Sequence, residues 1–430
     1  MRTITYWLSL VMIFVIPWEN VINIEGVGTI SRTVGLLLAM FWIISVVGTD
    51  RFRKPRAFHL VFIIFVLWHA ASVFWSVDID STLNSLFRYV QLFVFVYILW
   101  DLYTTPAALK AGLQAYVLGA YVSIGNVIVN YQAGVAEDFH RFSATGFNAN
   151  DVALILVLGM PVAWHLAVSE GSSSKTWLLR LINFAYVPVA LFAVLLTSSR
   201  AASFATLIVF LFILASLTSL KPYLRVLVFV AVTGSLLALQ PLVPERSFHR
   251  LATTGTEITE GDLNNRLGIW REGIVVFSEH PILGIGSGAF RAAATETRGV
   301  PHSFVVGLLT EVGSIGFGLF ATLVTMTVYS VGFLPKSHSR LWLTILIIWV
   351  LGAATHNWEH RKQTWLFLSL AVANASLFVR RRETRPTTTF PLDSSELTRS
   401  SAPDVPPIHG HDGMPDHRER QHGFNPKRSY

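Results

Sequence analysis

Long runs of apolar residues, separated by short polar segments, extend over most of the chain. The runs are about 18 to 22 residues long, which is the length that an α-helix needs to cross a bilayer. Apolar and polar residues do not alternate within them, so the pattern disfavours the shorter strands of a membrane β-barrel. The pattern therefore predicts an all-α, polytopic membrane protein.

The runs predict about twelve membrane-spanning helices, connected mostly by short loops. We expect residues 1–242 to contain helices 1–9, residues 243–301 to form one large loop, and residues 302–383 to contain helices 10–12. The first run lacks a small-residue cleavage site, so it is interpreted as a span and not as a signal peptide. Residues 384–430 are rich in Pro, Ser, Thr and His without an apolar period, which predicts a disordered tail. The spans are expected near residues 5–23, 29–48, 57–75, 84–102, 110–130, 151–168, 180–197, 202–220, 223–241, 302–330, 341–355 and 364–379.

Basic loops indicate the orientation of these spans. Four of them fall on one side of the predicted membrane, which the positive-inside rule assigns to the cytoplasm. The 384–430 tail then lies in the cytoplasm, and the large 243–301 loop lies on the opposite, outer side. The basic segments are DRFRKPR (50–56), KPYLR (221–225), PKSHSR (335–340) and RRRETR (380–385).

The predicted outer side contains many arginines but a single lysine, Lys362. Arginine binds phosphate through two parallel hydrogen bonds, whereas lysine acts as a point charge. The bias therefore fits a phosphate-containing ligand, although a general preference of this chain for arginine explains it equally well. The chain has no cysteine, which excludes disulfides and thiolate chemistry.

The segment LTSSRAAS (196–203) places Arg200 in a tight turn between two predicted spans, at the outer membrane surface. An arginine at this depth either extends to the lipid headgroups or takes part in an anion site. The N–H groups in the first turn of the following helix would favour phosphate there. The sequence leaves both interpretations open.

Residues 265–278 are predicted to form an amphipathic helix on the outer membrane surface. Arg266 lies at its start, and Arg271 faces a different side of the helix. In the following HPILGIGSG segment (280–288), Pro281 ends the helix, and three glycines allow a tight loop. These glycines follow no strand, so they do not indicate a nucleotide site. The apolar positions at helical spacing are Leu267, Trp270, Ile274 and Phe277.

His302 follows Pro301 at the start of the predicted 302–330 span. Imidazole accepts a proton near neutral pH, which suits a general base that acts on a hydroxyl, although a histidine at the interface can also be merely hydrated. Glu311 lies deeper in the same apolar run, where a carboxylate needs a partner or water. Its spacing does not let it orient His302 within one straight helix. The glycines at positions 313, 316 and 318 predict close packing of another helix.

Three weaker signals accompany these segments. Arg88 lies inside the fourth predicted span near its outer end, and we expect it to face a polar cavity. GFNAND (146–151) precedes the sixth span and contains Asn148, with Asn150 or Asp151 as the expected helix cap. The i, i+4 pair of His356 and His360 fits two metal ligands, but no third ligand is evident, so we predict no metal site.

In their order and spacing, these segments resemble the O-antigen ligase and O-antigen (polysaccharide) polymerase superfamily of bacterial integral membrane glycosyltransferases. The resemblance covers roughly residues 139–370. Ala149 departs from several members of the family, which have proline before the asparagine motif. The matching segments are GFNAND (146–151), TSSRAAS (197–203), NRLGIWREGIVVFSEHPILGIGSGAF (265–290) and PHSFVVGLLTEVGSIGF (301–317).

The resemblance implies an enzyme of the bacterial inner membrane whose active site faces the periplasm. Such an enzyme transfers a glycan from an undecaprenyl diphosphate carrier to an acceptor sugar hydroxyl with inversion, and needs no metal or other cofactor. On the matching positions, Arg200 and Arg266 would hold the diphosphate and His302 would activate the acceptor hydroxyl. We expect supporting roles for Arg88, Arg271, Glu311, Asn148 and Asn150.

The preferred interpretation is O-antigen ligation to lipid A–core in lipopolysaccharide biosynthesis. The alternative is an O-antigen or exopolysaccharide polymerase, which uses the same donor and adds to a growing polysaccharide. A polysaccharide transporter is less favoured, because most charges lie in the outer loops and not at mid-membrane. The expected partners are the lipid-linked donor, the acceptor and membrane lipids, and no nucleic acid is expected.

Overall fold

The computed structural model describes residues 1–26, 28–137, 141–168, 177–217, 266–294, 297 and 299–383, together with isolated residues between 222 and 247. Apart from a two-stranded antiparallel ribbon of β1 (Asn23–Ile24) and β2 (Gly28–Thr29), the regular structure of this part is helical, which confirms the all-α prediction. The predicted tail at 384–430 lies outside the described residues, as do most of the ninth predicted span and the first part of the large loop.

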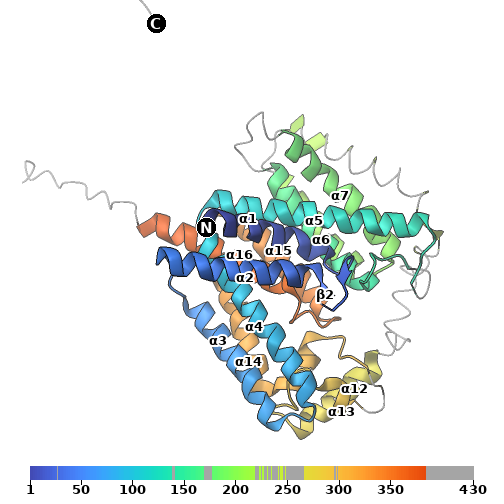
Figure 1. Cartoon of the computed structure of the whole chain (residues 1–430). Helices are drawn as coiled ribbons and strands as arrows, with labels where there is room; N and C mark the ends of the chain where they lie inside the picture. Colours follow the sequence, from blue (N-terminus) through green and yellow to red (C-terminus); the bar gives the residue numbers. More distant parts are fainter. Residues whose placement is uncertain are drawn as a thin grey trace, which may run out of the picture. The chain divides into compact units, whose positions relative to one another are not determined.

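The helices follow one another through short connections, many of which contain Pro, Gly or polar residues. Figure 1 shows how they pack. The amino-terminal helices are α1 (Arg2–Val15), α2 (Ile30–Thr49), α3 (Ala57–Ala71), α4 (Ile79–Leu102) and α5 (Pro106–Gln132), with short 3₁₀ turns at Ile16–Trp18 and Ser72–Trp75. The central helices are α6 (Ala149–Val168), α7 (Trp177–Thr197) and α8 (Arg200–Leu217). The remaining helices are α12 (Arg266–Glu279), α13 (Phe290–Ala293), α14 (Phe304–Gly332), α15 (Lys336–Ala353) and α16 (Lys362–Glu383).

Within the described residues, eight helices are long and apolar enough to cross a membrane, namely α2 to α8 and α14. Each of them coincides with a predicted span, so the protein is a polytopic membrane protein. The prediction of about twelve spans is confirmed only in part. The shorter α1, together with α15 and α16, occupies predicted spans without reaching the same apolar length, because α15 begins with KSHSR and α16 ends with RRRE.

Helix α6 forms the centre of the bundle and packs against α5, α7, α8 and α15. Almost all of its residues are buried, which is typical of a helix that is apolar on every side. Pro161 interrupts its hydrogen bonding. Two neighbouring tyrosines donate to carbonyls near this point, Tyr116 to Ile155 at 3.0 Å and Tyr186 to Leu156 at 3.1 Å. The hydroxyl groups of these two buried tyrosines therefore find partners inside the bundle.

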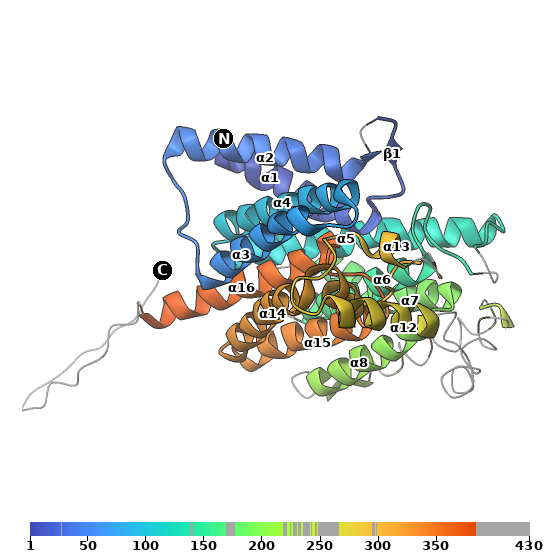
Figure 2. The ribbon, with the colours of Figure 1, turned by 90° about the horizontal axis from the view of Figure 1, so that it is seen from below.

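Helix α14 is broken at Gly313, whose φ of 67° and ψ of −173° lie outside the helical region. The 280–288 loop fills the break, and glycines with positive φ at 284, 286 and 288 confirm the predicted tight loop. Figure 2 shows α12, which precedes this loop, beside α14. Three backbone hydrogen bonds of 2.9 to 3.0 Å join the loop to the broken helix, from Ile285 to Thr310, from Gly286 to Glu311 and from Ser314 to Pro281.

The three glycines of α14 have different neighbours. At Gly313, a Cβ atom would collide with the carbonyl of Ile282, whereas at Gly318 nothing lies within 4 Å. At Gly316, a Cβ atom would lie 3.1 Å from Trp68 of α3. The predicted close approach of another helix therefore applies to Gly316, while Gly313 accommodates a loop and Gly318 has no close neighbour.

We expect Gly313→Ala to lower the melting temperature of the detergent-solubilised protein. The substitution forces a side chain into a backbone conformation that is almost exclusive to glycine, which costs about 1 to 3 kcal/mol. Gly318→Ala is the matched control, and its melting temperature should be unchanged or slightly higher, because alanine favours the helix. Equal melting temperatures of the two variants would contradict the close contact between the loop and the broken helix.

Candidate active site

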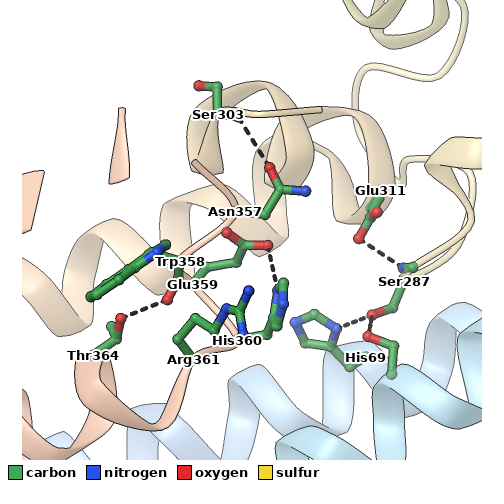
Figure 3. Close-up of polar contacts among 12 residues, drawn as sticks. His69, Ser287, Ser303, Glu311, Asn357, Trp358, Glu359, His360, Arg361 and Thr364 are labelled. Atoms are coloured by element: carbon green, nitrogen blue, oxygen red, sulfur yellow. Dashed lines mark hydrogen bonds and ion pairs between the residues drawn. The ribbon is translucent and has the colours of Figure 1, made fainter. Parts of the chain in front are cut away.

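His302 lies two residues before α14, in a backbone conformation with a φ of 47°. This left-handed region is uncommon for non-glycine residues but is visited by histidine. Hydrogen bonds hold the residues on both sides of it: Ser303 N donates to Asn357 Oδ1 at 3.1 Å (Figure 3), and Trp270 Nε1 donates to the Pro301 carbonyl at 2.9 Å. The His302 ring itself is half-buried and has no hydrogen-bond partner among the described residues. Its backbone is thus fixed while its ring stays available for a ligand.

Arg266, the first residue of α12, acts electrostatically on His302. Burial lowers the pKa of the His302 imidazole, and the Arg266 guanidinium lowers it further. The Asp151 carboxylate opposes both effects and raises this pKa. Because the net shift is downward from 6.5, the imidazole is neutral at pH 7 and can accept a proton.

His356 shares these surroundings, which the sequence did not indicate. It is buried, and burial lowers its pKa to about 4, while Asp151 raises this pKa and Arg266 and His302 lower it. Its Nδ1 lies 3.0 Å from the Gly352 carbonyl, and its Nε2 has no hydrogen-bond partner among the described residues. In the sequence, His356 is notable only for its i, i+4 spacing from His360.

The segment between α15 and α16 consists of turns, so His356 and His360 do not share a helix face as their spacing had suggested. The His360 Nδ1 instead lies 3.1 Å from the carboxylate of its neighbour Glu359. The same segment contains Asn357, whose side chain accepts the hydrogen bond from the Ser303 backbone N–H beside His302. This segment therefore borders the candidate site without the geometry of a histidine metal pair.

Asp151 connects the start of α6 to the segment between α15 and α16. One carboxylate oxygen accepts from Trp358 Nε1 at 2.8 Å, and the other accepts from Arg361 at 2.7 Å. The sequence had presented Asp151 only as a possible helix cap. A carboxylate at the start of an apolar span needs a charged or polar partner. From the sequence, this requirement could have predicted that Asp151 binds a distant polar side chain.

Asn148, and not Asn150 or Asp151, caps α6. The helix begins at Ala149, and Asn148 Oδ1 accepts from the Asn150 backbone N–H at 2.9 Å. The Asn150 side chain instead accepts from Arg141 at 2.5 Å, and Arg141 also donates to the Thr197 carbonyl at 2.9 Å. These two supporting asparagines thus fix the start of α6 and connect it to the end of α7.

Arg200 is the first residue of α8, in the turn that follows Thr197. The turn contains Ser198 with a φ of 51°. Through Arg141 and Asn150, this turn is joined to the start of α6, where Asp151 faces the His302 side of the molecule. The structure therefore places Arg266 and Asp151 within electrostatic range of His302, and it joins the turn that precedes Arg200 to the start of α6.

The other predicted supporting residues lie apart from His302. Arg271 is exposed on α12, and Arg88 lines a separate cavity. Glu311 accepts from the Gly288 backbone N–H at 2.7 Å, so it holds the glycine loop and not His302. Ser287 of the same loop lies 2.6 Å from His69 Nδ1, as Figure 3 shows. These contacts stabilise the loop on which the break in α14 depends.

Helix α12 lies where an amphipathic helix was predicted, and the side that packs against the protein is not the predicted apolar side. Ile269 and Gly273 are buried, whereas Leu267 and Ile274 are 47 % and 60 % exposed. The small Gly273 allows Val306 of α14 to approach closely, so packing selects this side of the helix. This contact positions Arg266 near His302.

Residues 185–321 match the sequence profile of the O-antigen ligase family. No curated protein matches the chain. The matched range contains Arg200, Arg266 and His302, whereas Asp151 and His356 lie outside it. It also contains α8, α12 and the broken helix α14 up to residue 321. The chain therefore contains a domain of the O-antigen ligase family, at residues 185–321.

Proposed function

We propose that this protein transfers a glycan from an undecaprenyl diphosphate carrier to the hydroxyl of an acceptor sugar, and that the reaction is the ligation of O-antigen to lipid A–core. The reaction would take place on the periplasmic face of the bacterial inner membrane. The observation that carries the proposal is a neutral His302 beside Arg266, within a domain of the O-antigen ligase family. A base and a fixed cation are the groups that this transfer requires.

In the proposed reaction, His302 takes the proton of the acceptor hydroxyl. The hydroxyl oxygen attacks the anomeric carbon from the face opposite the carrier, and the bond from that carbon to the diphosphate oxygen breaks. The electron pair of this bond goes to the diphosphate, whose growing negative charge Arg200 and Arg266 stabilise through charge-assisted hydrogen bonds. The anomeric centre is inverted, and undecaprenyl diphosphate leaves.

Charges around His302 suit both stages of this proton transfer. Arg266 lowers the pKa of His302, so the ring is neutral before the reaction. Asp151 raises the same pKa and stabilises the imidazolium that forms when the proton arrives. Because Asp151 is hydrogen-bonded to Trp358 and Arg361, its position relative to the ring is fixed. Asp151 thus acts as a positioning and electrostatic residue and does not need to contact the substrate.

The test is the lipopolysaccharide of a strain that lacks this protein, together with a transfer assay on the purified protein. We expect the deletion strain to retain lipid A–core without O-antigen, and the purified protein to join undecaprenyl diphosphate-linked O-antigen to lipid A–core. Core that carries a single repeat would identify a polymerase. An unchanged lipopolysaccharide profile with loss of exopolysaccharide would overturn the ligase assignment.

We expect transfer to depend on pH through His302. Only the neutral ring accepts a proton, so kcat/KM should hold at pH 7 and fall as the pH decreases through the lowered His302 pKa, below 6.5. Arg266→Gln removes one cause of the lowered His302 pKa. The pH range over which kcat/KM falls, the acid limb of the pH profile, should therefore move to higher pH, in addition to any loss in rate. Arg291→Gln, on an exposed residue of α13, should leave the limb in place. An acid limb that is identical in Arg266→Gln and wild type would argue against His302 as the base.

A further inference from the structure

A cavity of about 250 Å³ lies between α1, α2 and α4, beside the start of α16. It extends from the surface of the bundle into its interior, because it is lined both by Leu36, which is 58 % exposed, and by Leu38 and Ile98, which are each 1 % exposed. Most of its walls are apolar, but four basic side chains also line it: Arg32, Arg88, His360 and Lys362. The cavity thus combines apolar walls with several basic side chains.

Arg88 is the unusual residue of this cavity. It lies nine residues after the start of α4, or roughly 14 Å along a membrane-spanning helix. Its side chain is exposed and has no hydrogen-bond or ion-pair partner among the described residues. A charge inside a membrane-spanning segment is costly unless it is paired or faces a polar ligand. The position therefore calls for a counter-ion.

Neighbouring carboxylates do not supply this counter-ion. Glu19, beside the cavity, already binds Lys362 at 2.6 Å and accepts from the Ser31 hydroxyl. Glu311 acts on Arg88 only at electrostatic range, and its carboxylate accepts a hydrogen bond from Gly288. The Glu359 carboxylate contacts His360. The charge at Arg88 is thus left without a contact ion pair in the described part of the chain.

We propose that this cavity binds a membrane lipid with an anionic phosphate headgroup, whose phosphate contacts Arg88 and whose acyl chains lie along α2 and α4. A guanidinium matches phosphate through two parallel hydrogen bonds. The cavity volume suits a headgroup and the first methylenes, and the exposed Leu36 and Val90 continue the apolar surface toward the bilayer. Neither Arg200 nor Arg266 lines this cavity, and the proposed lipid binding does not depend on the proposed transfer reaction.

The first experiment measures lipid binding to the purified full-length protein in detergent by native mass spectrometry. We expect wild type to bind dioleoyl phosphatidic acid at least about tenfold more tightly than dioleoyl phosphatidylcholine. Arg88→Gln should lose about tenfold or more of this affinity, Arg88→Lys should lose less, and the control Arg291→Gln should bind as wild type does. Equal binding of the two lipids, or unchanged binding by Arg88→Gln, would overturn the proposal.

The second experiment keeps the charge of Arg88 and fills the cavity with a larger side chain. Leu36→Trp places an indole in its wall, whereas Leu37→Trp changes the next residue of α2, which is also exposed but does not line the cavity. We expect Leu36→Trp to lose phosphatidic acid binding and Leu37→Trp to retain it. Inorganic phosphate should not compete at concentrations near those of the lipid. Effective competition by inorganic phosphate would show a site for free anions. Equal loss of phosphatidic acid binding in both variants would show a general effect on α2. Either result would overturn the lipid assignment.

Discussion

Replacement of His302 should lower glycan transfer by about a hundredfold or more, which is the usual contribution of a general base. His302→Asn is the better variant, because asparagine also accepts the left-handed backbone conformation with a φ of 47° but cannot take the proton at neutral pH. His302→Ala removes the base as well, and adds backbone strain. The measurement is the initial rate of transfer from the undecaprenyl diphosphate donor to lipid A–core by purified protein.

The binding of the donor should change little in His302→Asn, since the diphosphate is proposed to rest on the arginines. His280→Asn is the matched control, because His280 is exposed at the end of α12 and contacts none of the proposed site residues. A normal transfer rate in His302→Asn would mean that the ring is only hydrated at the membrane surface. Loss of both transfer and donor binding would place His302 in the donor site and not on the acceptor side.

Lysine in place of Arg200 or Arg266 should slow transfer by about ten- to a hundredfold, although the charge is kept. Lysine loses the planar fork of the guanidinium, and one hydrogen bond to a charged group contributes roughly 1.5 to 3 kcal/mol. Because Arg266→Lys keeps a cation beside His302, its acid limb should stay near that of wild type. Arg266→Gln should shift the limb, and this difference separates the two roles of Arg266.

Arg291→Lys is the control within the described residues, since Arg291 is exposed on α13. Three further arginines of the large loop serve as controls and lie outside the described residues, namely Arg246, Arg250 and Arg298. The exchange to lysine at these four positions should leave the transfer rate nearly unchanged. A uniform result at every arginine would mean that net charge alone matters, and the abundance of arginine would then reflect only the composition of the chain.

Helix positions follow from the sequence better than helix ends do. The fourth and fifth spans were expected near 84–102 and 110–130, but α4 begins at Ile79 and α5 at Pro106. Both helices are started by a cap: Asp78 accepts from Ser81 N, and Thr105 accepts from Ala108 N, each at 3.1 Å. The first turn of α4 contains Asp80, Ser81 and Thr82, and Lys110 follows the first turn of α5. A search for apolar runs does not register such turns, although the capping residues are visible in the sequence.

The sequence by itself determined the membrane-spanning helices that the structure describes, the tight glycine loop, and the order of the segments that contain Arg200, Arg266 and His302. These features are local, because each depends on apolar length, on glycine and proline, or on a short motif. Only the tertiary structure decided which residues surround His302. Asp151 meets Trp358 across 207 residues of chain, and Asn357 and His356 reach the site from the segment after α15. Such contacts depend on how the helices pack around α6 and α14, which the periodicity of any one segment does not contain. The same packing buries Ile269 and Gly273 of α12 against the protein, and leaves Arg88 in a cavity between three helices.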